Sequence, residues 1–117
     1  MAEQFKNLVQ LYERSCRTYA LRKLFGTQKD GRWNWLTYGD FAKLVDAFRG
    51  GLASLGVKPG DRVAIIADNR VEWAVAAYAT YGLGAAFVPM YEAQLAKEWH
   101  FIIEDCGATV AIGSTPA

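Results

Sequence analysis

Two short polar stretches are the best candidates for chemistry in this sequence. Residues 68–70 (Asp-Asn-Arg) follow a strand predicted over 63–67, and residues 91–92 (Tyr-Glu) follow a second strand predicted over 85–88. Parallel strands end at one edge of a sheet, where open α/β sheets bind ligands. We therefore expect both stretches at one edge. Helix capping by Asn69 explains the first stretch without a ligand and is the favoured interpretation, and a loop with a single exposed acid is favoured for the second.

The other reactive side chains form no recognisable active site. The sole histidine, His100, has Glu104 one helical turn later, which favours a surface pair over a catalytic one. Gly82-Leu83-Gly84 follows a helix and lacks a third glycine, so it indicates a helix stop rather than a nucleotide-binding turn. No nucleophile stands beside a base, and no carboxylate pair or phosphate-binding loop is present. The sequence thus predicts no catalytic residue and no metal ligand.

The composition is that of a globular protein. The chain has 117 residues, 52% of them hydrophobic, and a net charge of +1, so it forms one domain at most. Binding of nucleic acid usually requires a clustered basic face, and we expect no such partner. A small basic group is interpreted as a solvated helix and strand edge; it consists of Arg14, Arg17, Arg22 and Lys23. Cys16 and Cys106 match no metal or redox spacing and indicate reduced, partly buried thiols in a cytoplasmic protein.

The uncharged run over residues 73–91 has nearly the length of a membrane-spanning helix, about 20 residues. It is rich in alanine and is interrupted by Gly82, Gly84 and Pro89. These features favour a helix, a glycine stop and a short buried strand over a membrane span. The N-terminal residues carry charge where a signal peptide needs an apolar core.

The first third of the chain is predicted to form a helix and a hairpin. Apolar residues recur at helical spacing from Phe5 to Cys16. A strand is predicted over 19–25, a turn-rich loop over 26–31 and a second strand over 32–37. Together these indicate an antiparallel hairpin after the helix.

The rest of the chain alternates helices with strands. Thr37 and Asp40 are typical of a helix start, Gly50-Gly51 indicates close packing within that helix, and Gly56 ends it. Further strands are predicted over 63–67, 85–88 and 109–112, separated by a helix that Asn69 caps and a helix that Gly107 ends. The fold class is therefore α/β: helix and hairpin over residues 1–36, then a helix and a βαβαβ parallel-sheet unit over 37–117.

Five pieces of the sequence, in order, resemble the N-terminal region of the AMP-forming acyl-CoA synthetases. This superfamily also contains luciferases and the adenylation domains of peptide synthetases. The amino-acid sequences of the third and fourth pieces (residues 68–73 and 84–91) are most similar to those of long-chain fatty acid–CoA ligases. The pieces are residues 36–40 (LTYGD), 51–65 (GLASLGVKPGDRVAI), 68–73 (DNRVEW), 84–91 (GAAFVPMY) and 103–108 (IEDCGA).

The resemblance implies a two-step reaction for the complete enzyme. A carboxylate and ATP, with Mg²⁺, give an acyl-adenylate, and the thiol of coenzyme A then forms the thioester. The family's Ser/Thr/Gly-rich loop, its ribose-binding Asp and its C-terminal lysine are absent from this sequence. The resemblance thus implies an incomplete AMP-binding domain over residues 1–117, inactive alone. Its partner would be the remainder of the same polypeptide, in a cytoplasmic enzyme peripheral to a membrane.

The resemblance also implies one set of site residues. In related ligases, the backbone after the strand that matches Ala86–Val88 lines the route of the pantetheine arm of coenzyme A. The corresponding wall residues here are Tyr91, Glu92 and Ala93. Some relatives have paired glycines where this sequence has Glu92 and Ala93, and those glycines allow closer approach of the backbone to the ligand.

Two other functions remain open at this point. An unfinished parallel sheet exposes an edge and apolar faces, which favours a stand-alone interaction module that forms a homodimer. An aryl-activating or amino-acid-activating enzyme is the other alternative, because the residues that select the acyl group lie outside this sequence.

Overall fold

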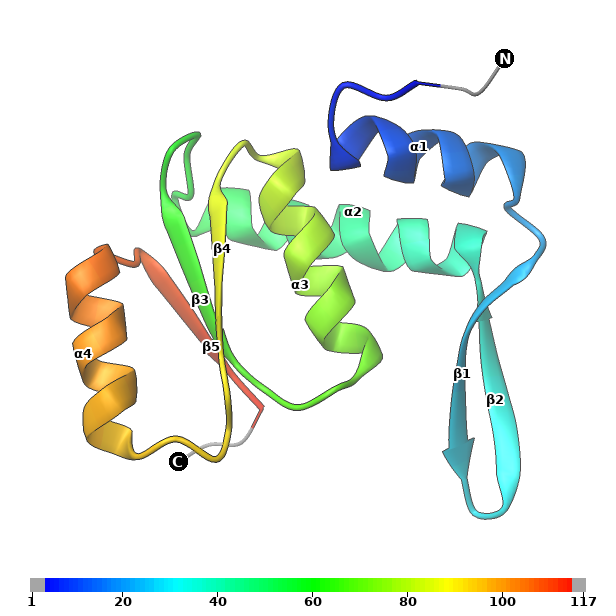
Figure 1. Cartoon of the computed structure of the whole chain (residues 1–117). Coiled ribbons are helices and arrows are strands. Elements are labelled where there is room, and N and C mark those ends of the chain that lie inside the picture. Colours follow the sequence, from blue (N-terminus) through cyan, green and yellow to red (C-terminus); the bar gives the residue numbers. More distant parts are fainter. Residues whose placement is uncertain (1–3, 115–117) are drawn as a thin grey trace.

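A helix and a β-hairpin begin the chain, as the spacing of apolar residues predicts. The computed structural model describes residues 4–114 (Figure 1). Helix α1 spans Leu8–Thr18, and the Asn7 side chain accepts a hydrogen bond from the backbone N–H of Gln10 at its start. Strands β1 (Lys23–Lys29) and β2 (Arg32–Thr37) pair antiparallel.

The hairpin corrects the expected position of its first strand. The pattern predicts a strand from Tyr19, but residues 19–22 form turns, and the expected loop over 26–29 belongs to β1. Only Asp30 and Gly31 connect the strands, with φ angles of 54° and 74°. Positive φ at both positions is typical of a type I′ turn, whose twist matches that of the strands. The Asp-Gly pair was the signal for this tighter turn.

Helix α2 (Tyr38–Ser54) begins with the predicted capping box. The Thr37 Oγ1 accepts a hydrogen bond from the backbone N–H of Asp40 at 3.0 Å, and the Asp40 carboxylate accepts one from the N–H of Thr37 at 3.2 Å. The helix ends before Gly56, as expected. The expected close packing at Gly50-Gly51 is wrong, because no atom beyond the adjacent residues and the helix's own backbone lies within 4 Å of a Cβ placed on either residue.

The predicted βαβαβ unit is confirmed as a three-stranded parallel sheet. Strand β3 lies in the centre and pairs with β4 on one side and β5 on the other. Helices α3 and α4 lie on opposite sides of the sheet (Figure 1), as two right-handed crossovers in opposite directions require. The elements are β3 (Arg62–Ile66), α3 (Val71–Gly82), β4 (Ala86–Met90), α4 (Ala96–Cys106) and β5 (Val110–Gly113).

The ends of the two crossover helices match the predictions only in part. Gly107 adopts a left-handed conformation and ends α4, as expected. The predicted cap of α3 is wrong: its N-cap is Arg70, with no capping hydrogen bond from a side chain. Asn69 lies one residue before the N-cap of α3. Helix capping therefore does not explain why an asparagine occupies this position.

A cluster of aromatic rings holds the N-terminal elements together. Phe41 of α2 is 3% exposed, and its ring centroid lies 5.9 Å from that of Tyr12, 5.2 Å from that of Phe25 and 6.1 Å from that of Tyr78. These partners come from α1, β1 and α3. Edge-on contacts of this kind add to the free energy gained by burial, so Phe41 joins four elements.

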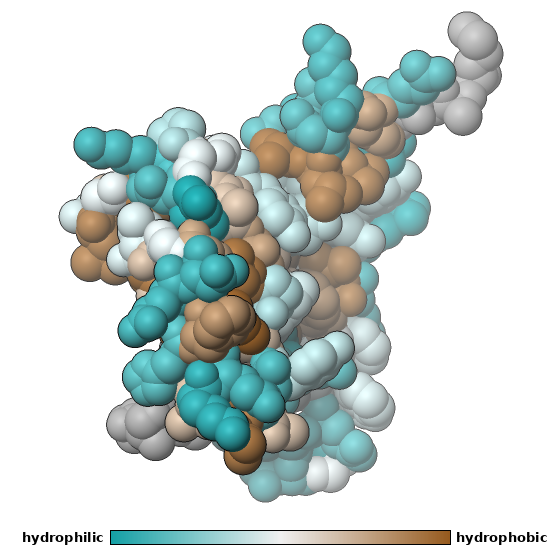
Figure 2. Space-filling model, turned by 60° about the vertical axis from the view of Figure 1, so that its left-hand side comes forward, coloured by the Kyte–Doolittle hydropathy of each residue, from teal (hydrophilic) through white to brown (hydrophobic). Residues whose placement is uncertain are grey.

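The other side of the sheet is less well covered. No residue of α4 is fully buried, whereas α2 and α3 together contribute eight buried residues. Figure 2 brings the α4 side forward and shows apolar patches among hydrophilic side chains.

Within residues 4–114, no helix has the length and apolar character needed to cross a membrane. Cys16 and Cys106 are free and half-buried, as expected.

We expect Phe41→Ala to lower the free energy of unfolding by about 3–5 kcal/mol, because it removes a buried ring and leaves a cavity. Urea unfolding followed by circular dichroism measures the change. Leu44→Ala, three residues along the same helix at a position 44% exposed, is the control and should cost about 1 kcal/mol or less. Equal losses for both variants would contradict the central place of Phe41.

Candidate ligand-binding edge

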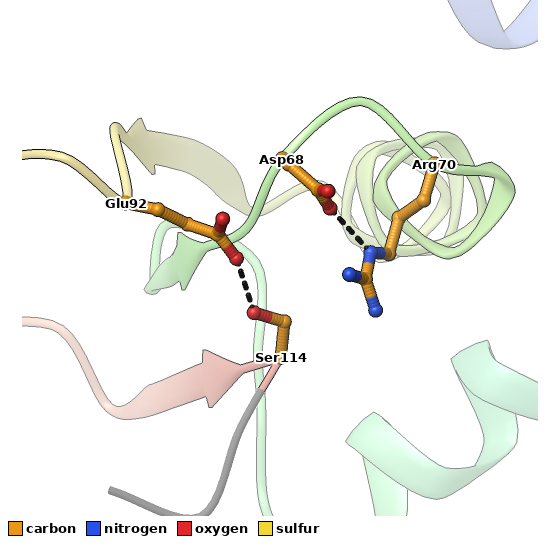
Figure 3. Close-up of polar contacts among 4 residues, drawn as sticks. All are labelled: Asp68, Arg70, Glu92 and Ser114. Carbon is orange, nitrogen blue, oxygen red and sulfur yellow. Dashed lines mark hydrogen bonds and ion pairs between the residues drawn. The ribbon is translucent and has the colours of Figure 1, made fainter.

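The carboxyl ends of the three parallel strands bring four polar residues to one edge of the sheet (Figure 3). Asp68 and Arg70 lie between β3 and α3, Glu92 lies between β4 and α4, and Ser114 follows β5. The Nε of Arg70 lies 2.6 Å from Oδ1 of Asp68. The Ser114 hydroxyl donates a hydrogen bond to the Glu92 carboxylate. The two predicted stretches therefore meet at one edge, as expected.

Arg70 and Asp68 shift each other's pKa at this edge. Its hydrogen bond to the Asp68 carboxylate lowers the pKa of Asp68 below the ordinary value. The same hydrogen bond, with the attraction of Asp68, Glu72 and Glu92, raises the pKa of Arg70. Both side chains of the ion pair are about half exposed, so solvent screens the pair and it contributes little to stability. It fixes the direction of the guanidinium group instead.

The loop after β4 is held by hydrogen bonds from its backbone to two side chains. The Trp99 Nε1 donates a hydrogen bond to the carbonyl oxygen of Tyr91 at 2.8 Å, and the backbone N–H of Tyr91 donates one to the Gln94 side chain at 3.1 Å. Tyr91, Glu92 and Ala93 are all exposed. The loop is thus fixed while its surface stays open to a ligand.

The described residues offer polar contacts at this edge but no assembled catalytic group. Ser114 was missed in the sequence, where its only signal was its place directly after the third strand. Its hydroxyl has a carboxylate partner in Glu92, but no further group orients that carboxylate in the contacts described. His100 and Glu104 are exposed on α4. Among residues 4–114, no three His, Cys, Asp or Glu side chains come close enough to hold a metal ion.

A large open groove begins beside this edge. It has a volume of about 1510 Å³ and runs between the hairpin, α2, the start of α3 and β5. Most of its lining is apolar, and Leu55, which contributes to it, is 70% exposed. Its lining residues include Phe25, Leu36, Leu44, Phe48, Leu55, Arg70, Trp73, Val110 and Ile112.

The groove ends at an open edge of the sheet. Strand β5 pairs only with β3 within the described residues, and β4 forms the opposite edge. Unpaired strand edges and exposed apolar surface are features that proteins normally cover. The geometry is therefore that of a small α/β sheet with an open strand edge beside an apolar groove, and with polar residues at the carboxyl ends of its strands.

The sequence model of the AMP-binding enzymes matches residues 12–117. This range takes in the capping box, the three parallel strands and the polar edge. The chain belongs to the AMP-binding enzyme family.

Two relatives show the range of this family. The chain is 38% identical over 86 residues to a long-chain-fatty-acid–CoA ligase of Mycobacterium tuberculosis, a match that covers 74% of this chain and 14% of the relative. It is 36% identical over 75 residues to an L-proline–[L-prolyl-carrier protein] ligase of Streptomyces coelicolor, covering 64% of this chain and 14% of that one. The chain thus spans about a seventh of the length of these relatives.

The fold agrees with that of solved family members. The inhibitor-bound N-terminal domain of FACL13 from Mycobacterium tuberculosis superposes with a TM-score of 0.84 at 28% identity. The match covers 93% of this chain and 27% of that domain. The mixed α/β architecture described here is therefore that of part of an adenylate-forming N-terminal domain.

We expect Arg70→Gln to return the pKa of Asp68 to its ordinary range, because the neutral amide gives up the charged hydrogen bond. The pKa of Asp68 is measured by NMR titration of its carboxyl carbon. Arg62→Gln, at an exposed position near the opposite end of β3, is the matched control and should leave that pKa low. An unchanged pKa in Arg70→Gln would contradict the ion pair of Figure 3.

Proposed function

We propose that this chain is the N-terminal structural part of an ATP-dependent long-chain fatty acid–CoA ligase. The complete enzyme would join a fatty acid to ATP as an acyl-adenylate and then transfer the acyl group to coenzyme A. The family match over residues 12–117 carries this proposal. The 38% identity to a long-chain-fatty-acid–CoA ligase supports the choice of substrate class.

The groove supports a structural role for this part. Its apolar lining, with Leu55 largely exposed and Leu44 partly exposed, would gain free energy by burial against further residues of the same polypeptide. The open edge of β5 could accept another strand in the same way. We propose that the remainder of the AMP-binding domain fills the groove and extends the sheet.

The polar edge supports a role in the second step. Tyr91, Glu92 and Ala93 are exposed on a loop that Trp99 and Gln94 hold in place. We propose that these three residues form a wall of the route taken by the pantetheine arm of coenzyme A. An extended, uncharged arm needs a fixed and accessible surface, and this loop has both properties.

ATP and Mg²⁺ would be held elsewhere in the complete enzyme. Within residues 4–114, no three His, Cys, Asp or Glu side chains come together as a cluster that could hold a metal ion by protein ligands alone. Arg70 is an exposed cation at the ligand edge, but two acids beside it and the Asp68 partner oppose the approach of a phosphate. The proposal therefore assigns no step of adenylation to these residues.

An amino-acid-activating enzyme is the alternative within this family. The 36% identity to the L-proline ligase favours it, but that match covers less of the chain than the match to the fatty acid ligase. A fatty acid and an amino acid differ in charge and length, so one assay separates the two functions.

In the complete enzyme that carries this sequence, we expect exchange of labelled pyrophosphate into ATP with fatty acids of long chain length. Aryl acids and proline should support little exchange, and residues 1–117 alone should support none. A folded complete enzyme that prefers proline or an aryl acid would overturn the fatty acid proposal. If the folded complete enzyme catalyses no pyrophosphate exchange with any of the acids tested, the ligase proposal is overturned.

We expect Leu55→Asp to change the stability of the complete enzyme much more than that of the 117-residue chain. In the chain this side chain is 70% exposed, so the charge costs about 0.5 kcal/mol or less. In the complete enzyme the groove would be filled, and a buried unpaired carboxylate would cost several kcal/mol. Thermal unfolding of both proteins measures the difference.

Leu8→Asp, at an exposed position at the start of α1 outside the groove, is the control for Leu55→Asp. It should change neither protein by more than about 1 kcal/mol. Equal, small effects of Leu55→Asp in both proteins would show that nothing covers the groove.

We expect Ala93→Trp to raise the KM for coenzyme A about tenfold or more in the complete enzyme, with unchanged pyrophosphate exchange. The indole ring would narrow the proposed route, while the adenylation step does not use that route. Ala96→Trp, at an exposed position on the first turn of α4, is the control. An equal KM for coenzyme A in both variants would contradict the wall at residues 91–93.

A further inference from the structure

The hydrogen bond between Ser114 and Glu92 crosses the end of the central strand. The sheet order is β4-β3-β5, so β4 and β5 do not pair with each other. Neighbouring strands lie about 4.8 Å apart, which separates β4 from β5 by roughly 10 Å. A backbone hydrogen bond cannot span that distance. The long Glu92 side chain points toward Ser114 and accepts the hydrogen bond of its hydroxyl group (Figure 3).

The register of the sheet brings these two residues to nearly the same level. Ile66, the last residue of β3, pairs with Met90 of β4 and with Gly113 of β5. Ser114 lies one residue beyond this level, and Glu92 lies two residues beyond it. A shift of β5 by one residue would turn the Ser114 side chain to the other face of the sheet. The hydrogen bond therefore depends on the parallel register.

Ser114 is a fixed donor. Its backbone N–H donates to the carbonyl oxygen of Ile66 at 3.2 Å, which continues the pairing of β5 by one residue. The residue is half-buried, whereas Glu92 is exposed. Glutamate is among the side chains that lose the most conformational freedom when they are ordered. A fixed partner is therefore needed to decide where the Glu92 carboxylate lies.

Arg70 is the other group that attracts Glu92, but it is already paired. The hydrogen bond with Asp68 is the main cause of the raised pKa of Arg70, and Glu92 adds a weaker attraction. The Arg70 Nε lies 2.6 Å from Oδ1 of Asp68. Ser114 thus sets the direction of the Glu92 side chain, across the end of β3 and toward β5 (Figure 3).

We propose that Ser114 is a positioning residue for the reaction with coenzyme A. This inference rests on the proposed function, in which Tyr91, Glu92 and Ala93 line the route of the pantetheine arm. While Ser114 holds it, the Glu92 carboxylate lies over the strand ends and leaves the loop surface open. A released carboxylate would move over that surface, where an uncharged arm could bind only by displacing its water.

The other two contacts of the loop have a different effect. Trp99 and Gln94 bond to the backbone of Tyr91 and fix the path of the chain. The Ser114 hydrogen bond instead controls the one acidic side chain of residues 91–93. A surface that is ordered in advance binds a ligand more tightly, because binding does not have to order it. Loss of the Ser114 hydroxyl should therefore weaken binding of coenzyme A.

The test uses the complete enzyme that carries this sequence and measures the KM for coenzyme A. We expect Ser114→Ala to raise this KM about tenfold, an effect typical of one hydrogen bond to a charged group. The kcat and the rate of pyrophosphate exchange should each change less than about twofold, because the variant affects binding rather than chemistry. A fall in kcat with an unchanged KM would assign Ser114 to the chemical step and overturn the proposal.

Two further variants control for the loss of a hydroxyl group in general. Ser114→Thr keeps the donor and should leave the KM for coenzyme A within about threefold of the original value. Ser15→Ala removes a half-buried serine hydroxyl from α1 and should change the KM less than about twofold. An equal KM for Ser114→Ala and Ser114→Thr would contradict a role for the hydroxyl group.

A double-mutant cycle shows whether Ser114 acts through Glu92. In a Glu92→Ala background, Ser114→Ala should change the KM for coenzyme A less than about twofold further, because no carboxylate remains to be released. The same tenfold effect of Ser114→Ala in both backgrounds would show that Ser114 acts without Glu92. That result would overturn the positioning role.

The exchange assay separates this inference from the proposed function. Exchange with fatty acids, together with an unchanged KM for coenzyme A in Ser114→Ala, would overturn the positioning role and leave the ligase proposal intact. A folded original enzyme that catalyses no exchange with any acid would overturn both. A raised KM with normal exchange supports both, and it also shows that the variant is folded.

Discussion

Strand β3 has three consecutive buried residues, Val63, Ala64 and Ile65, and the rest of the structure follows from their need for cover. Alternate side chains of a strand face opposite sides, so burial of all three requires a layer on each face and a neighbour at each edge. Buried residues of α2 and α3 form one cluster with Val63, α4 lies on the opposite side of the sheet from α3 (Figure 1), and β4 and β5 supply the edges.

The start of β3 also sets the register of both neighbours. The backbone N–H of Ala86 donates to the carbonyl oxygen of Asp61 at 2.8 Å, and that of Thr109 donates to the carbonyl oxygen of Arg62 at 2.9 Å. Both neighbouring strands thus begin beside two adjacent residues. Because all three strands are short and parallel, they end at one level. The polar residues of Figure 3 meet there because each follows one of these strands directly in the sequence or within a few residues.

The parts of the fold with a local physical cause could be predicted from the sequence. The capping box at Thr37, the left-handed stop at Gly107 and the buried run of β3 each require particular residue types at fixed spacing. The start of β1 could not be read in this way, because Tyr19 to Arg22 has strand-like composition but bonds to the start of α2 instead. The turn at Asp30-Gly31 could have been predicted from the dipeptide.

The candidate site shows the limit of such reasoning more clearly. The sequence places residues 68–70 and 91–92 after strands, and this placement predicts their shared edge. It does not indicate the Arg70–Asp68 pair or the Ser114–Glu92 bond, because these depend on side-chain directions. The groove could not be predicted from the sequence either, because it forms between a hairpin and a strand about 80 residues apart.

The groove and the polar edge of the sheet differ in a way that the average composition conceals. The groove is mostly apolar and lies beside an open strand edge, so it suits burial by protein. The polar edge carries the Arg70–Asp68 ion pair and the Ser114–Glu92 hydrogen bond (Figure 3). Burial of charged groups costs free energy unless they are paired, so the edge is less suited to burial than the groove. The positions of both kinds of residue therefore argue for two different neighbours: protein at the groove, and solvent or a ligand at the polar edge.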